Sequence, residues 1–311
     1  MNIGLNNFKN LLLVTALYFT TSVYADSFKY NTYNNHGVVG LINIPTARFY
    51  DEGVHGITLY DGTPDQKMTL SSNPYDWLEA SFFYTNIQGR PYCEVLWDPV
   101  CQQDYKDKGF NLKLKLMEQD GKFPSIAIGL NDFAGTGLYS SEYLVGSYGF
   151  KKTDFHFGLG WGQLNGSGVG LKNPMGYINN NFFERPGGQS FSDDKGGTID
   201  AGRFFSDKEV SPFFGISHLY KDKILLKFEY DPTITPGFVG YKEDNYHFSY
   251  GFEYLYNDRF SIGLSHERGN NFALRLSYKN NPLSTYTRSE YSRAPVSQQD
   301  NQYTKLIKNL E

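Results

Sequence analysis

The chain has 311 residues, a formal net charge of −4, and 25 tyrosines and 25 phenylalanines. A charge this small and negative excludes a protein that binds nucleic acid through a basic surface, because phosphate contacts need clustered lysine and arginine. Six scattered histidines and two cysteines show no ligand spacing, so neither a metal centre nor a cofactor is predicted.

Residues 1–25 have the pattern of a cleaved signal peptide. Lys9 is basic, the stretch from Leu11 to Phe19 is apolar, and Val23-Tyr24-Ala25 is a small-x-small cleavage site. The apolar stretch is shorter than the roughly 20 residues that a membrane-spanning helix needs. The chain is therefore expected to be exported, and no cysteine lies at the cleavage point to be acylated.

Residues 53–280 repeat one unit, a run that alternates apolar with polar or small residues and ends in a turn. In one copy Phe248, Tyr250 and Phe252 alternate with Ser249 and Gly251. Period two is typical of a sheet with one apolar and one polar face. Candidate strands lie at 54–61, 66–72, 77–87, 109–118, 124–131, 137–150, 153–163, 197–206, 211–220, 222–230, 246–256, 259–267 and 270–279.

With an export signal and a high aromatic content, this pattern predicts an all-β fold: a transmembrane antiparallel β-barrel of about 12 strands (10–14) in a bacterial outer membrane. The negative mean hydropathy does not oppose this, since barrel strands present only alternate residues to lipid. Aromatic residues near strand ends, such as Phe82, Phe83, Phe213 and Phe214, suit the interfacial girdles. The alternative is the core of a soluble β-sandwich.

The connections predict an orientation. Residues 119–122, 151–152 and 257–258 are tight turns, whereas residues 88–108 and 164–196 are long insertions. Short turns face the periplasm in barrels of this class and long loops face outward. Cys93 and Cys101 bracket a short segment in one long loop and are predicted to form a structural disulfide. Residues 26–52 are a predicted periplasmic lead-in or plug, and residues 281–311 a polar tail.

No catalytic residue emerges from the motifs, although a Glu229–Glu253 pair could act on a glycosidic bond if the separation were suitable. Inward-facing polar side chains are instead predicted to line a polar lumen, either sugar-binding or plugged. That set comprises Lys113, Lys115, Arg203, Lys227, Glu229, Glu253 and Arg275.

Four blocks of the sequence are distinctive: residues 37–48 (GVVGLINIPTAR), 124–132 (PSIAIGLND), 135–143 (GTGLYSSEY) and 155–162 (FHFGLGWG). In this order they resemble the YjbH-like family of Gram-negative exopolysaccharide-associated outer-membrane proteins. The resemblance covers residues 36–280. It implies an outer-membrane barrel linked to making or exporting an extracellular polysaccharide, with no catalytic residues to transfer. Family members are often about twice as long and commonly lipoproteins, so either this is a single-barrel relative or a partner supplies the missing half.

Two interpretations of the GLINIPTAR motif, with Asn43, Pro45, Thr46 and Arg48, remain open. Pro45 favours a bend over a central strand, and Arg48 could pair with a lumen acid and seat the segment as a plug. The other interpretation is an edge strand ending on a solvated arginine. For function, the prediction is a non-enzymatic assistant in polysaccharide export or surface assembly, with lipid, polysaccharide and other export proteins as partners. The alternatives are a general porin and a lumenal polysaccharide-modifying enzyme.

Overall fold

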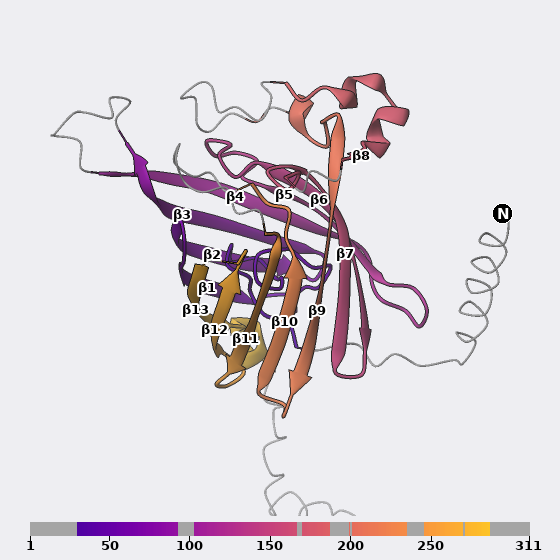
Figure 1. Ribbon diagram of the computed structural model, residues 1–311. Coiled ribbons are helices and arrows are strands. Elements are labelled where there is room, and N and C mark those ends of the chain that lie inside the picture. Colours follow the sequence, from indigo (N-terminus) through magenta and orange to yellow (C-terminus); the bar gives the residue numbers. More distant parts are fainter. Residues whose placement is uncertain are drawn as a thin grey trace, which may run out of the picture.

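The computed structural model describes residues 30–92, 103–166, 170–186, 199, 201–234, 246–269 and 271–286. Twelve antiparallel strands form a closed barrel, because the first strand pairs with the last (Figure 1). The barrel strands are β1 (His55–Asp61), β2 (Asp65–Tyr75), β3 (Leu78–Pro91), β4 (Asp104–Met117), β5 (Ser125–Asn131), β6 (Ser141–Phe150), β7 (Thr153–Gly162), β9 (Glu209–Tyr220), β10 (Ile224–Tyr230), β11 (Phe248–Leu255), β12 (Phe260–Glu267) and β13 (Asn271–Asn280).

The predicted class and strand number are thus confirmed, but one candidate strand was wrong. Within residues 197–206 the described part contains the 3-10 helix η3 (Ala201–Arg203), and β7 pairs directly with β9. Phe205 has a positive φ of 57°, and its ring packs edge-on against Trp161. This segment belongs to a folded outer connection with β8 (Leu171–Lys172), η1 (Pro174–Tyr177) and η2 (Asn180–Phe183).

The connections separate the two ends of the barrel (Figure 1). Tight turns join β6 to β7 at Lys151-Lys152 and β9 to β10 at 221–223, on the same end as the turn between β11 and β12. We call this the turn end; in outer-membrane barrels it faces the periplasm. The opposite, loop end carries the connection between β7 and β9. The cysteine pair, residues 1–25 and residues 287–311 lie outside the described residues; η4 (Pro282–Tyr286) follows β13.

The barrel is apolar outside and polar inside, the reverse of a soluble protein. Large apolar side chains on the outer face of every barrel region are exposed, including Leu59, Leu70, Phe110, Phe157 and Leu264. A continuous exposed apolar surface of this kind marks contact with an apolar phase, here lipid. No helix in the described residues is long and apolar enough to cross a membrane.

A small apolar core lies inside the barrel, between the wall and the chain that precedes β1. Leu41, Ile44, Ala47 and Phe49 of that segment pack against wall residues that include Phe213. Phe213 and Phe83 are fully buried, whereas Phe214 and Phe82 face outward. The prediction that both members of each pair join a girdle was therefore wrong, because successive strand side chains point to opposite faces.

Candidate functional site: a plug inside the barrel

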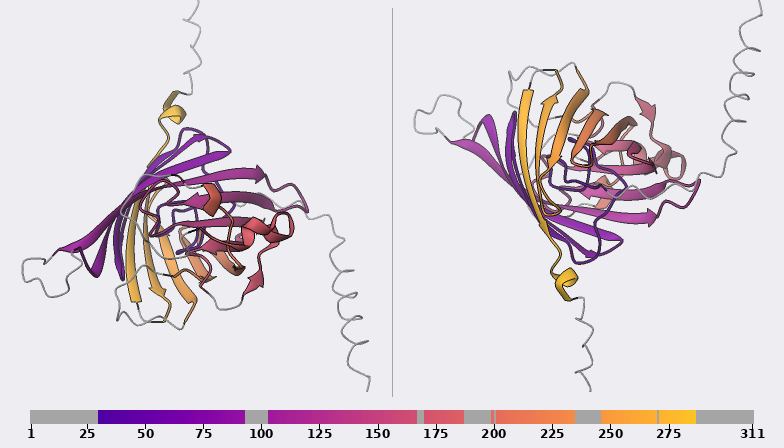
Figure 2. Two further views of the ribbon diagram at one scale, coloured as in Figure 1. Left: turned by 90° about the horizontal axis from the view of Figure 1, so that it is seen from above. Right: turned by 90° about the horizontal axis from the view of Figure 1, so that it is seen from below.

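The described part of the predicted lead-in, residues 30–52, lies inside the ring of strands and is here called the plug (indigo in Figure 2). It folds back twice, through isolated bridges between Tyr33 and Val39 and between Gly40 and Pro45. Gly37 has a φ of 75°, and a Cβ there would lie 2.3 Å from Thr69 on the wall. This close approach requires glycine.

A buried ion pair seats the far end of the plug. The Arg48 guanidinium donates Nε to one oxygen of Asp154 at 2.8 Å and Nη2 to the other at 2.7 Å. Its remaining donors reach Ser125 and Gln119. Arg48 is 6% exposed and Asp154 on β7 is 1% exposed. The pair is therefore bidentate and desolvated, which makes its geometry specific.

Lys113 makes a second link between plug and wall. Its ammonium lies 2.5 Å from the carboxylate of Glu79, its register partner on β3, and donates to the carbonyl oxygens of Val39 and Arg48. The other Glu79 oxygen accepts the Val39 amide at 2.7 Å. This one ion pair on the wall thus provides hydrogen-bond partners for both an N–H group and carbonyl groups of the plug. Buried backbone groups need such partners.

Glu229 holds the tip of the plug. Its carboxylate accepts backbone amides from Ile42 (2.9 Å), Asn43 (2.8 Å) and Ile44 (3.3 Å). Three converging amides form a small anion-binding concavity on the plug. Asn43 and Asn35 also donate to Glu267 of β12 through their side-chain amides.

A charge cluster on β10, β11 and β13 supports the same segment. Glu253 accepts from Lys227 at 2.5 Å and from Arg275 at 2.6 Å. Lys227 also donates to Thr32 and to the Leu41 carbonyl, and Arg275 donates to Asn35. Arg275 reaches Glu253 across Gly263 of β12, where a Cβ would lie 2.8 Å from the guanidinium.

The structure places most of the predicted lumen residues on the inner wall, but not all in one group. Lys113, Lys227, Glu229, Glu253 and Arg275 contact the plug or its partners. Lys115 faces inward near the turn end, beside Phe49 and paired with Glu118. Arg203 was wrongly placed in the lumen: it lies on η3 in the outer connection, because its segment is not a strand.

Sequence reasoning missed three carboxylates that hold the plug: Glu79, Asp154 and Glu267. The alternation did contain a signal, since exposed Phe155 and Phe157 flank inward positions. Pro45 lies in a bend and Thr46 is buried against the Val39 carbonyl. The plug interpretation of the motif matches this placement, and Arg48 is not solvated.

The plug leaves little free volume along the lumen. A cavity lined by His36, Pro45 and Tyr139 has about 30 Å³, and one beside Thr46 and Asp154 has about 10 Å³. A water molecule needs roughly 10–15 Å³ measured in this way, so these spaces hold about one or two waters. Burial and nearby Lys67 and Arg268 lower the pKa of His36 in the plug well below its usual value, so it stays neutral. Among the described residues no group of three metal-ligating side chains occurs.

Glu229→Gln is expected to loosen the tip of the plug without unfolding the barrel. The amide retains one oxygen but turns an NH₂ group toward a backbone N–H donor, and leaving that buried donor unsatisfied costs about 1–3 kcal/mol. Limited proteolysis within residues 30–52 should become faster. The barrel itself should stay folded, so unboiled and boiled protein should still migrate differently on SDS gels. Gln66→Ala, which removes an exposed side-chain hydrogen bond to Asp61 and leaves Glu229 untouched, is the control; equal proteolysis in both variants would contradict this role.

The fold and site define a twelve-stranded β-barrel of the outer-membrane type whose lumen is filled by its own N-terminal segment. The family model described as "Exopolysaccharide biosynthesis protein YbjH" matches residues 32–309. The chain therefore belongs to this exopolysaccharide biosynthesis family, and the resemblance in the four sequence blocks is confirmed.

The chain is 33% identical over 278 residues to the uncharacterized lipoprotein YjbH of Escherichia coli (strain K12). The match covers 88% of this chain and 39% of that protein, so the chain spans about two fifths of the length of this curated relative.

Among solved structures, a KdgM porin matches with a TM-score of 0.37 and 8% identity, over 73% of this chain and 97% of the porin. A NanC porin matches with a TM-score of 0.36, 7% identity, and 73% and 98% coverage. OprD of Pseudomonas aeruginosa matches with a TM-score of 0.25, 12% identity, and 74% and 67% coverage. Scores this low carry no argument about what this chain does.

Proposed function

We propose that this protein is a non-enzymatic barrel of the bacterial outer membrane, exported through a cleaved signal peptide, which assists export or surface assembly of an extracellular polysaccharide. Membership of the exopolysaccharide biosynthesis family supports a role with an extracellular polysaccharide, and the apolar outer face supports a location in the membrane. The observation that carries the proposal is the plug, which is held by specific charged contacts on opposite walls of the barrel.

A general diffusion porin is the second candidate, and the plug weighs against it. Eight strands enclose a space that side chains alone can fill, whereas 16–18 leave an aqueous channel. Twelve strands lie between these limits and leave room that the plug occupies here. A barrel filled in this way opens only when the plug moves, which suits a protein that acts when a partner or polymer engages it.

The contacts of Glu229 and Glu253 with the plug in place weigh against glycoside cleavage by this pair. Such a reaction needs one carboxylic acid and one carboxylate that both reach the sugar. Glu229 is occupied by three plug amides and Glu253 by Lys227 and Arg275, and both side chains are fully buried. Other export proteins are the partners that we propose for the turn end.

The test measures the amounts of cell-bound and released polysaccharide in the native host with and without the gene. Loss or relocation of polymer in the deletion strain, restored by the intact gene on a plasmid, is the expected result. Unchanged polymer together with altered uptake of small solutes would overturn the proposal in favour of the porin.

A further inference from the structure

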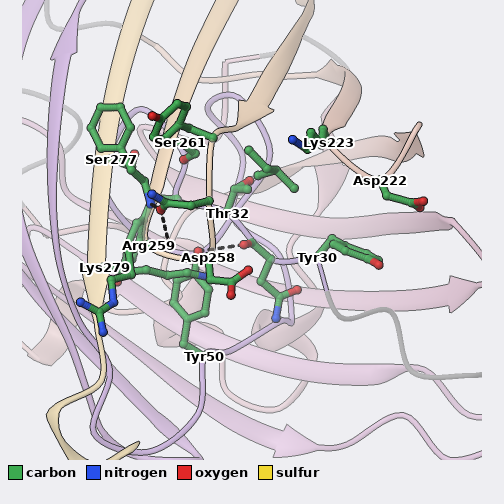
Figure 3. A pocket seen from close by; sticks show the side chains of 16 residues that line it. Tyr30, Thr32, Tyr50, Asp222, Lys223, Asp258, Arg259, Ser261, Ser277 and Lys279 are labelled. Carbon is green, nitrogen blue, oxygen red and sulfur yellow. Dashed lines mark hydrogen bonds between the residues drawn. The ribbon is translucent and has the colours of Figure 1, made fainter. Parts of the chain in front are cut away.

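A pocket of about 310 Å³ opens at the turn end, between the start of the plug and the ends of β10 to β13 (Figure 3). It adjoins the smaller of the two lumen cavities described above, with which it shares Tyr30, Asn31 and Thr32 in its lining. Its size falls at the lower end of the roughly 300–1,000 Å³ found for small-molecule sites. We call it the periplasmic pocket and argue its ligand from three features of its lining.

The first feature is a set of buried hydroxyl groups that have no hydrogen-bond partner in the described residues. Tyr33 and Ser277 line the pocket, and Thr58 lies opposite Ser277 on the neighbouring strand. These residues are 1%, 4% and 1% exposed, and none of the three oxygens has a hydrogen-bond partner within the described part of the chain. Leaving such a group unsatisfied costs about 1–3 kcal/mol. These oxygens are buried, and no group in the described residues uses their hydrogen-bonding capacity.

The three hydroxyl groups lie on neighbouring residues, and the Tyr33 hydroxyl is neutral. Ser277 pairs with Thr58 in the β13–β1 register, and the next inward pair is Lys279 with Gly56, over which the Tyr33 ring lies. Burial, with a smaller contribution from Glu79, raises the pKa of Tyr33 above its usual range, so it remains a neutral donor.

The second feature is an excess of positive charge. Lys223, Arg259 and Lys279 line the pocket with Asp222 and Asp258. Asp222 already forms an ion pair with Lys152 at 2.7 Å, and no ion pair involves the three cations within the described residues. The Lys279 ammonium lies 4.1 Å from the centroid of the Tyr50 ring, and both residues line the pocket. The pocket therefore favours an anionic ligand.

The third feature is aromatic rings at the pocket edge. Tyr30 is 38% exposed and Tyr256 63% exposed, and Tyr256 packs edge-on against Phe260. A tyrosine ring offers a flat apolar face with a polar tip. Such a face complements the C–H face of a pyranose, while hydroxyls and cations complement its oxygens.

We propose that the periplasmic pocket binds one acidic sugar residue, a pyranose carrying a carboxylate, of a polysaccharide that approaches from the periplasmic side. The carboxylate lies between Arg259 and Lys279, and Tyr33 and Ser277 bind the ring hydroxyls. This deepens the proposed function and rests on it. The pocket adjoins Thr32 and Tyr50 of the plug, so an occupied pocket lies against the segment that fills the lumen.

The test uses the purified full chain, folded in detergent, titrated with a tetrasaccharide of mannuronic acid and with a tetrasaccharide of glucose. We expect the acidic probe to bind at least about tenfold more tightly, a difference of 1.4 kcal/mol, and its affinity to fall as salt is raised. Arg259→Gln/Lys279→Gln should lose this preference. Lys151→Gln, a turn lysine at the same end outside the pocket lining, should keep it.

Ser277→Ala separates a binding role from a structural one. If its hydroxyl serves only the fold, removing an unpartnered group leaves probe affinity unchanged; our proposal requires a severalfold loss of affinity with thermal stability unchanged or higher. Equal binding of the two sugars, binding unaffected by the double variant, or binding of an acidic peptide but of neither sugar would overturn the inference. None of these results depends on polymer export in the host, so the pocket and the proposed function can fail separately.

Discussion

Deleting residues 36–50 is expected to turn a nearly silent protein into a steadily conducting pore in planar lipid bilayers. The deletion removes Arg48 and the amides that Glu229 binds, which are the main attachments of the plug to β7 and β10. Twelve strands without this segment enclose more space than their own side chains fill.

A matched variant separates loss of the plug from a shortened chain. Replacing residues 36–50 by a glycine–serine linker of equal length keeps the tether but removes the side-chain contacts of this segment, including that of Arg48 with Asp154, and it should conduct as well. The folded state of each variant is checked by different migration of unboiled and boiled protein on SDS gels. A folded barrel that stays as silent as the parent, in either variant, would show that the plug does not control permeation.

Breaking the Arg48–Asp154 pair from one side is expected to cost about 3–5 kcal/mol, because a buried charge is left without its partner. Arg48→Met and Asp154→Leu should each lower the temperature at which the compact unboiled form is lost. The double variant should recover most of that loss, since no uncompensated charge remains. Losses that simply add would contradict a direct pairing.

The chain provides a control for this cycle. Lys152 and Asp222 form an ion pair of the same 2.7 Å separation, but their side chains are 54% and 68% exposed, against 7% and 1% for Arg48 and Asp154. Solvent and salt screen an exposed pair, so it contributes little to stability. Lys152→Met is therefore expected to leave the transition temperature nearly unchanged, so the two pairs separate the effect of burial from the effect of distance.

Much of the barrel follows from local pattern. Phe248, Tyr250 and Phe252 face outward because side chains alternate along a strand, and the same rule places Ser249 and Glu253 inside. The tight turn at Lys151-Lys152 followed from a short polar connection between two alternating runs. The rule failed at 197–206, where residues 201–203 form a 3-10 helix and Phe205 has a positive φ and packs against Trp161, a contact that the local pattern does not contain.

The plug illustrates the limit of local pattern. Pro45 and Arg48 indicated a bent segment whose arginine pairs with an acidic residue of the lumen. The pattern does not say which one, because several acidic residues lie at inward positions, among them Glu79, Asp154, Glu229, Glu253 and Glu267. Which of them meets Arg48 depends on strand stagger and on the path of the plug. Those quantities are set by pairing across the whole closed sheet.

The class of fold, the two faces of the wall and the approximate strand number could be predicted from the sequence, because they depend on period-two alternation and on turns within a few residues. Three features became evident only in the folded barrel: residues 30–52 fill the lumen, Arg48 binds Asp154, and Tyr33, Ser277 and Lys279 line one pocket. The physical reason is separation: these groups lie up to 246 positions apart in the chain, and only barrel closure between β1 and β13 brings them together.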